Sequence, residues 1–282
     1  MLFLSHGGGP CWLLNGASNP MMSEMDEKSK GAEFFRTLTS SIGQGSKPKA
    51  IVIISAHWEE AQFTVNSFSE NTPLTYDYYG FPPTTYAPHL TYPAKSDAAL
   101  QDRAYQLIKA EFGAEGAAMS TTSRGFDHGV FIPLKLAFPE ADVPIVQVSC
   151  RSDLDFTSHI RLGKALAPLA DEGFWIIGSG STTHNLREIM GRGSWVAPFV
   201  SWLTSTLVGA HEAPKAARDK MTRLMELAPN AHTAHPRTEH LVPLLVCFGA
   251  AWPTDEPSSI RAKKIFSQTV AGTLSLDSFS FI

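Results

Sequence analysis

Short apolar segments of strand length recur along this 282-residue chain and alternate with longer segments of helical periodicity. Continuous apolar runs of this length are typical of strands that are buried on both faces of a sheet. The expected strands are residues 1–5, 50–55, 62–67, 144–149 and 174–179, with a weaker one at 262–267. The expected helices are 96–112, 153–170, 196–210, 214–228 and 239–251. This alternation predicts an α/β fold with a central sheet covered by helices on both faces.

Length and composition narrow the class of protein further. The length allows one large domain or two small ones, and because no linker or internal repeat interrupts the pattern we expect a single domain over 1–282. A net charge of -4 without a basic run makes nucleic acid an unfavourable partner. No apolar run approaches the roughly 18 residues that span a bilayer, and no secretory leader is recognisable, so no membrane association is expected.

Cysteine usage indicates the compartment. Cys11, Cys150 and Cys247 form an odd set without CxxC spacing. Such a set predicts free thiols and a cytoplasmic protein.

Five of the ten histidines lie at predicted strand or helix ends, most of them near Gly, Ser or Asp: His6, His57, His128, His184 and His240. A single histidine of this kind is usually structural, but ligands in α/β proteins gather where strands end. Together these five therefore indicate a binding site. The other five are expected to be mostly solvated, although one of them, His235, precedes His240 closely enough to line the site: His89, His159, His211, His232 and His235.

The stretch SHGGGP places three glycines directly after His6. It lacks the GK[ST] of a phosphate-binding loop, and the chain has no Gly-x-Ser-x-Gly elbow to accompany an esterase oxyanion loop. We therefore expect the glycines to clear room beside His6 for a metal ion and a planar substrate.

Six motifs in order resemble the class III extradiol ring-cleavage dioxygenases, and more narrowly their 4,5-DOPA dioxygenase branch: SHGGGP, SAHW, YDYYGFP, GFDHG, GSGSTTHNL and HPRTEHLVPLLVCFGAA. The resemblance extends from residue 2 to about residue 251 and implies a mixed central sheet and one catalytic domain. It also implies His6, His57 and His240 as metal ligands, His184 as the acid/base residue and His128 as a second active-site histidine.

Protocatechuate-cleaving relatives use two histidines and a glutamate as ligands, and this chain has His240 at the glutamate's place, with Glu239 immediately before it. Adjacent helical residues point about 100° apart, so only one of the two is expected to face the metal easily.

The chemistry implied is the opening of a catechol ring, such as that of DOPA, with dioxygen. Three protein ligands on one face of Fe(II) leave three positions open, two for the catechol oxygens and one for dioxygen. The YDYYGFPP loop, with Tyr79 and Phe81, is a candidate wall over the ring, and Arg237 or Arg124 a candidate partner for a substrate carboxylate. Asp127 is expected to cap the helix at 129–137.

Two other functions remain open. Three histidines and a water also make a tetrahedral site for Zn(II), so a zinc hydrolase is the main alternative, and zinc is a possible bound ion. A non-enzymatic metal-binding protein is a third possibility, but such a protein needs neither His184 nor His128. The expected partners are a small-molecule catechol and dioxygen, and the chain is expected to be a monomer or a homodimer.

Overall fold

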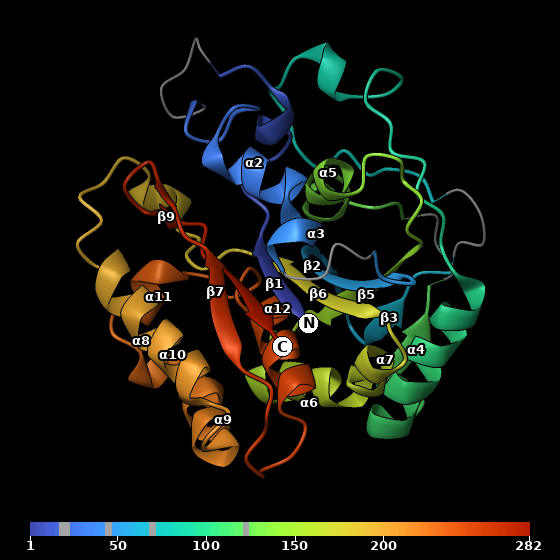
Figure 1. Ribbon diagram of the computed structural model, residues 1–282, viewed down its shortest axis with the longest axis vertical. Helices are drawn as coiled ribbons and strands as arrows, with labels where there is room; N and C mark the ends of the chain where they lie inside the picture. The colour runs from blue at the N-terminus through green and yellow to red at the C-terminus, as the bar shows by residue number, and fades with distance from the viewer. Residues whose placement is uncertain (17–22, 43–46, 68–71, 121–123) are drawn as a thin grey trace.

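An eight-stranded mixed sheet lies at the centre of the structure, a computed structural model that describes residues 1–16, 23–42, 47–67, 72–120 and 124–282 (Figure 1). Its strand order is β4-β3-β5-β2-β6-β1-β10-β7. The strands are β1 (Leu2–Ser5), β2 (Ile51–Glu60), β3 (Phe63–Val65), β4 (Ala117–Met119), β5 (Ile145–Arg151), β6 (Trp175–Gly180), β7 (Ala262–Phe266) and β10 (Ser278–Phe281). A separate pair consists of β8 (Thr269–Val270) and β9 (Leu274–Ser275). The four central strands β5, β2, β6 and β1 run parallel, so their carboxyl ends meet at one edge.

Helices cover both faces of this sheet. They are α2 (Lys30–Arg36), α3 (Leu38–Ser41), α4 (Ala98–Phe112), α5 (His128–Ala137), α6 (Phe156–Leu166), α7 (Pro168–Asp171), α8 (Val196–Gly209), α9 (Pro214–Thr222), α10 (Leu224–Leu227), α11 (Ala231–Ala234) and α12 (Val242–Ala251). Short 3₁₀ turns occur at Cys11–Leu13, Pro83–Thr85 and Leu186–Glu188. In Figure 1, α2, α3 and α5 lie on one side of the sheet, and α4, α6 and α12 on the other. The predicted α/β class with a mixed sheet between helical layers is therefore confirmed.

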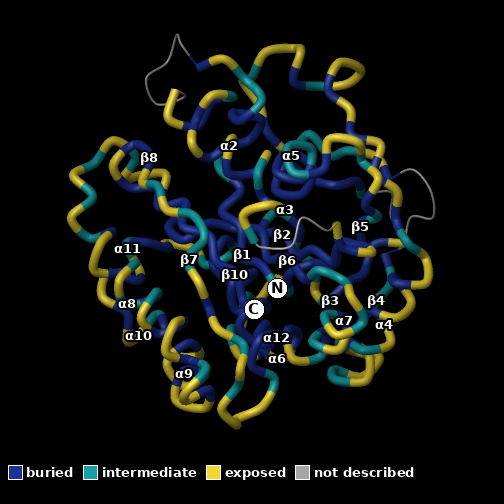
Figure 2. Tube along the Cα trace, viewed as in Figure 1, coloured by how far each residue is buried: buried dark blue, intermediate teal, exposed yellow. Residues whose placement is uncertain are grey.

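The strand sequences account for the two layers. Ile51 and Ile53 pack into the core with α2 and α5, whereas Val52 and Ile54 pack into the opposite core with α4, α6 and α12. Successive side chains of a strand point to opposite faces, so a continuous apolar run supplies both cores at once. Figure 2 shows the result, with buried central strands and exposed outer surfaces on the helices.

The predicted elements are largely present, with two kinds of difference. The expected helices at 153–170 and 214–228 are each divided in two, the first at Pro168, which lacks the amide hydrogen that a continuing helix needs. Several short elements were not predicted: α2, α3, α11, β4, β8, β9 and β10.

The most consequential of these omissions is β10, which pairs antiparallel with β1 and brings the two chain ends together (Figure 1). Its serines, Ser278 and Ser280, interrupt the apolar run that identified the other strands, yet both are fully buried.

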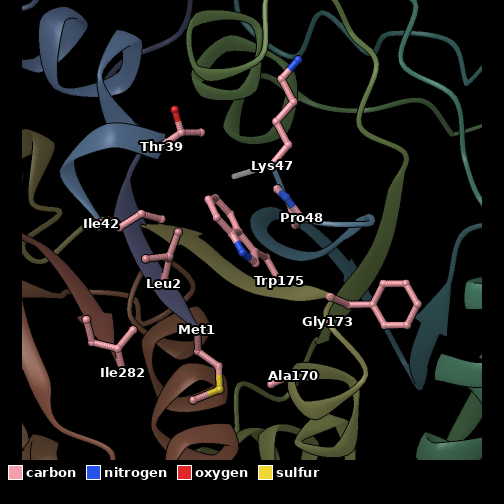
Figure 3. Close-up of a pocket in the computed structure, with 11 residues that line it drawn as sticks. Met1, Leu2, Thr39, Ile42, Lys47, Pro48, Ala170, Gly173, Trp175 and Ile282 are labelled. Atoms are coloured by element: carbon pink, nitrogen blue, oxygen red, sulfur yellow. The ribbon is translucent and has the colours of Figure 1, made fainter. Parts of the chain in front are cut away.

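A cavity of about 510 Å³ lies at the amino ends of β1 and β6, with Leu2 and Trp175 in its wall (Figure 3). His6 follows the opposite, carboxyl end of β1, so this cavity is separate from the predicted site. Cys11, Cys150 and Cys247 are all buried, and no disulfide joins them. Among the residues that the structure describes, no helix combines the length and apolar character needed to cross a bilayer.

Candidate active site

His6 leaves the carboxyl end of β1 and is almost fully buried. Its backbone amide donates a hydrogen bond to the carbonyl of Gly180 at 3.0 Å, which continues the parallel pairing of β1 with β6. The first glycine after His6 serves the protein's own packing. Gly7 has a φ of +73°, and a Cβ there would lie 1.9 Å from Nε1 of the buried Trp12. The packing against Trp12 accounts for Gly7, so the room that the glycines were expected to leave for a metal ion and a planar substrate is not needed to explain this residue.

His57 lies inside β2, not after it as predicted. The strand pairs with β5 through Ile54, and pairing resumes only at Glu59, opposite Cys150, so the β2 segment between them is bulged. An inserted segment of this kind bends a strand and redirects its side chains, and such bulges are common next to active sites. The bulge places His57 at the carboxyl edge while β2 continues to Glu60.

His240 lies in a turn, two residues before α12 begins. Its carbonyl accepts a hydrogen bond from the Ser181 amide at 3.0 Å. Glycine at the end of β6 allows this approach, because a Cβ on Gly180 would lie 2.2 Å from the His240 carbonyl oxygen. The local sequence therefore fixes His240 beside the loop that carries His184.

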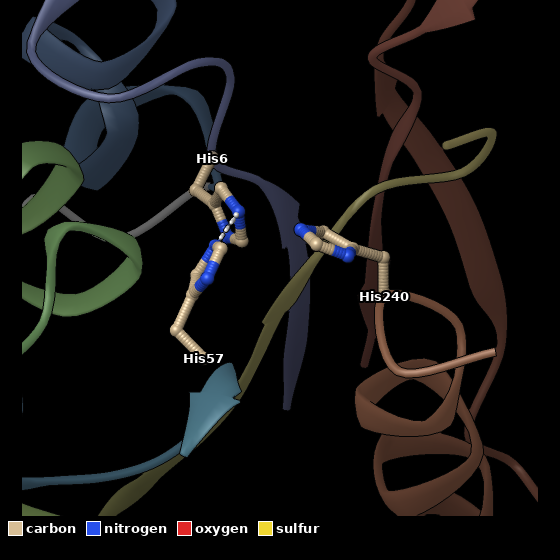
Figure 4. Close-up of side chains that lie close together, drawn as sticks. All are labelled: His6, His57 and His240. Carbon is tan, nitrogen blue, oxygen red and sulfur yellow. Dashed lines mark hydrogen bonds between the residues drawn. The ribbon is translucent and has the colours of Figure 1, made fainter. Parts of the chain in front are cut away.

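The three predicted ligands converge. Ligand atoms of His6, His57 and His240 all lie within 4.8 Å of one another, and Figure 4 shows a ring nitrogen of His240 directed toward the other two. The Nε2 atoms of His6 and His57 are 3.0 Å apart. Two nitrogens that bind one ion at about 2.1 Å and at right angles have about this separation. The residues present thus fit a single metal ion.

Burial keeps these imidazoles in the form that binds metals. Desolvation, reinforced by the neighbouring histidines, lowers the pKa of His57 to about 4 and the pKa of His6 and His240 well below the usual value. Only a neutral imidazole has a lone pair for a metal. The Nδ1 atoms of two ligands have acceptors nearby, Ser179 Oγ at 2.9 Å for His6 and Glu239 Oε1 at 2.8 Å for His240, which leaves Nε2 of each ring for the ion.

Two further histidines lie against this triad. His128 is the first residue of α5, and its ring centroid is 4.0 Å from that of His57. His184 follows β6, and its backbone amide donates to the Ala234 carbonyl at 2.9 Å. Its ring is stacked on His240. The structure therefore gathers all five histidines that the sequence placed at element ends.

Two carboxylates complete the site. Asp77 accepts a hydrogen bond from Nδ1 of His128 at 2.8 Å. Burial by itself would raise the pKa of Asp77, but this bond, the charges of His128 and His57 and the hydrogen bond from the His128 backbone amide together lower it to about 2. Glu239 lies between His240 and His184, whose hydrogen bonds likewise overcome the effect of burial and lower its pKa far below the usual value. Glu239 and His240 occupy a turn, not the expected helix, and both side chains reach the site. Of the two, only His240 belongs to the converging set with His6 and His57, whereas Glu239 contacts Nδ1 of His240.

Asp77 was missed in the sequence. The available signal was an acidic residue within the aromatic YDYYGFP segment.

The candidate substrate-binding residues differ in position. Tyr79 is 91% exposed. Phe81 is half-buried and contacts Tyr78, with ring centroids 5.5 Å apart; a Cβ on Gly9 would lie 3.1 Å from its ring. Arg237 is bound by Glu59 through two hydrogen bonds of 2.6 Å and lies 3.3 Å from Glu239, so a substrate carboxylate would compete with both.

Other polar residues near the site have structural partners. Arg124 donates to the His57 carbonyl and pairs with Asp127. Asp127 occupies the N-cap position of α5 but does not cap it; its carboxylate instead accepts from Ser55 and Gln147.

Of the histidines outside the site, His159 differs from the expectation of a solvated side chain, and His235, which was expected to line the site, lies behind it. His159 is fully buried, as is His235. His235 Nε2 lies 2.8 Å from the Thr182 carbonyl oxygen, so it supports the loop before His184 and is outside the ligand cluster.

Converging neutral imidazoles at the carboxyl edge of a parallel strand set, with two further histidines packed against them, are typical of α/β enzymes that work through a metal ion. Comparison gives the family. Residues 3–273 match the model of the catalytic LigB subunit of aromatic ring-opening dioxygenase, and the chain belongs to this family.

Individual relatives agree with this assignment. A 4,5-DOPA dioxygenase extradiol of Beta vulgaris is 38% identical over 99% of this chain and 95% of its own length. One from Escherichia coli is 32% identical over 78% of each chain. The crystal structure of an uncharacterized Escherichia coli K12 protein superposes with a TM-score of 0.72 at 26% identity, over 99% of this chain and 97% of that one.

Proposed function

We propose that this protein is a non-haem Fe(II)-dependent extradiol dioxygenase that opens the ring of a catechol such as DOPA with dioxygen. Residues 1–282 form one catalytic domain, His6, His57 and His240 bind the iron, and His184 and His128 move protons. The observation that carries the proposal is the convergence of five histidines at one sheet edge, in a chain of the ring-opening dioxygenase family.

Bound Fe(II) would supply the sites at which catechol oxygens and dioxygen meet and would make the catechol easier to deprotonate. The surplus histidines argue for catalysis, because metal binding alone needs no more than the triad. An imidazole titrates near neutral pH and can take a proton from a catechol hydroxyl and return it later in the reaction. His184 and His128 lie on two sides of the triad, against His240 and His57 respectively, and so reach the substrate from two directions.

Three residues at the edge of the site are proposed to bind the part of the substrate that carries its side chain. Arg237 is proposed to bind a substrate carboxylate by exchanging its partner Glu59, while Phe81 and Tyr79 border the ring. The chain is proposed to act in the cytoplasm as a monomer or homodimer, without nucleic acid or membrane.

The alternative is a zinc hydrolase, since three histidines are also a zinc donor set. Anaerobic loading with Fe(II) or Zn(II), followed by air and a panel of catechols with and without a carboxylate, distinguishes the two. We expect oxygen uptake and a yellow ring-opened product with Fe(II) alone. Ester hydrolysis by the zinc form, without oxygen uptake by the iron form, would establish the alternative.

A further inference from the structure

Each of the two site carboxylates lies between one proposed metal ligand and one histidine outside the ligand set. Asp77 is 2.8 Å from Nδ1 of His128 and 3.6 Å from Nδ1 of His57. Glu239 is 2.8 Å from Nδ1 of His240 and 3.5 Å from Nδ1 of His184. The short contact of Asp77 is therefore to a non-ligand, whereas the short contact of Glu239 is to a ligand.

A carboxylate fixes the tautomer of the imidazole that it contacts. An ionised carboxylate only accepts hydrogen bonds, so the ring nitrogen that faces it carries the proton. In a neutral ring the other nitrogen then has a free lone pair, which can bind a metal ion or accept a proton.

Both carboxylates are themselves fixed in place. The side chain of Asp77 is 18% exposed, and its Oδ1 also accepts the backbone amide of His128 at 3.0 Å. The second oxygen of Glu239 faces Arg237 at 3.3 Å, and Arg237 is bound in turn by Glu59. Neither carboxylate is free to turn away from its histidines without breaking a second contact.

We propose that Asp77 and Glu239 are positioning residues with different roles: Asp77 holds His128 as the Nδ1–H tautomer for proton transfer, and Glu239 holds His240 as an Nε2 ligand. The proton transfer from a substrate rests on the proposed function, whereas the two tautomers do not. In the transfer step, a catechol O–H bond breaks, its electron pair stays on the oxygen, and the proton binds Nε2 of His128. The resulting imidazolium lies against the Asp77 carboxylate, which offsets its charge.

Matched amide variants separate the two roles. Asp77→Asn and Glu239→Gln keep the size of each side chain and remove its charge, and Asp142→Asn, at an exposed pair with Lys47, is the control. Three properties are measured on each protein: the dissociation constant for Zn(II), the tautomer of His128 in the zinc form by long-range proton–nitrogen NMR, and kcat and KM of the iron form with a catechol. The signals of His128 are assigned with His128→Gln.

We expect Glu239→Gln to change mainly zinc binding and Asp77→Asn to change mainly the His128 tautomer and kcat. Glu239→Gln should weaken zinc binding about 10- to 100-fold, the usual effect of losing a partner behind a metal-binding histidine. Asp77→Asn should change zinc affinity by less than about 3-fold, move the His128 proton away from Nδ1, and lower kcat by about 100-fold or more with little change in KM.

The proposal is wrong if Glu239→Gln binds zinc as tightly as the unchanged protein, or if Asp77→Asn leaves both the His128 tautomer and kcat unchanged. It is also wrong if Asp77→Asn loses zinc as readily as Glu239→Gln. Absence of ring opening by the unchanged iron form would overturn the proposed function instead, and the zinc and NMR measurements would still decide this proposal.

Discussion

The imidazole rings of His184 and His240 are stacked, with centroids 3.5 Å apart and planes 17° from parallel. One oxygen of Glu239 lies near Nδ1 of both rings. A residue proposed to move protons is thus packed directly on a residue proposed to bind the metal. Activity alone cannot separate these roles, so metal content has to be measured beside turnover.

Alanine substitution of any of the three proposed ligands should abolish metal binding. His6→Ala, His57→Ala and His240→Ala each delete one of three converging nitrogens, and activity should fall in proportion to metal content. His89→Ala is the matched control, because His89 is exposed and outside the cluster. Metal analysis after gel filtration checks the prediction, and full metal occupancy in any of the three variants would remove that residue from the ligand set.

Gly7→Ala should destabilise the fold before it affects chemistry. The new Cβ would overlap the buried indole of Trp12 in a backbone of positive φ, at a combined cost of about 2–4 kcal/mol. Urea unfolding of the metal-free protein measures this. Gly209→Ala, at the end of α8 with open space around it, should change the free energy of unfolding by less than about 1 kcal/mol. Equal stability of the two variants would show that the Trp12 contact is unimportant.

The sequence predicted the fold and the five histidines because both depend on local patterns. Apolar runs such as AIVIIS identify strands that are buried on two faces. His6 follows such a strand directly, and His184 follows another a few residues after its end. Because parallel strands end at the same edge of a sheet, residues that follow different strands are expected to lie close together there, even when they are far apart in the sequence.

Other features depend on contacts that a linear pattern does not contain. The bulge that places His57 within β2 arises from its pairing with β5, and the burial of the serines in β10 arises from its place between β1 and β7. Asp77 belongs to the site only because its loop contacts His128 at the start of α5.

Acid should destabilise the fold partly through His159, which lies far from the ligands in sequence and is fully buried. Burial lowers its pKa to about 4, below the usual value of about 6.5. Between these pH values the unfolded chain binds a proton that the folded chain does not. The stability is therefore complete above about pH 6.5 and falls toward pH 4, by up to about 3 kcal/mol for this residue.

The test compares how the free energy of unfolding depends on pH, not its absolute value. His159→Gln retains a donor and an acceptor for Asp155 and Arg151 but cannot titrate. Its unfolding free energy should fall less steeply between pH 6.5 and 4 than that of the unchanged protein, by about one proton. Identical slopes would mean that His159 does not contribute to acid sensitivity.

Removal of His184 should slow the reaction without releasing the metal. His240 keeps its 2.8 Å contact with Glu239 when the stacked ring is deleted, so the ligand triad is retained in His184→Ala. Loss of a general acid/base group typically costs about 10²–10⁴ in rate, and single-turnover oxygen consumption should fall on that scale. His57→Ala, prepared in parallel, should lose iron instead. If His184→Ala loses iron as readily as His57→Ala, His184 is a ligand. If His184→Ala keeps both iron and full activity, the proton passes through another group. His128, whose Nδ1 contacts Asp77, is then the residue positioned to carry it.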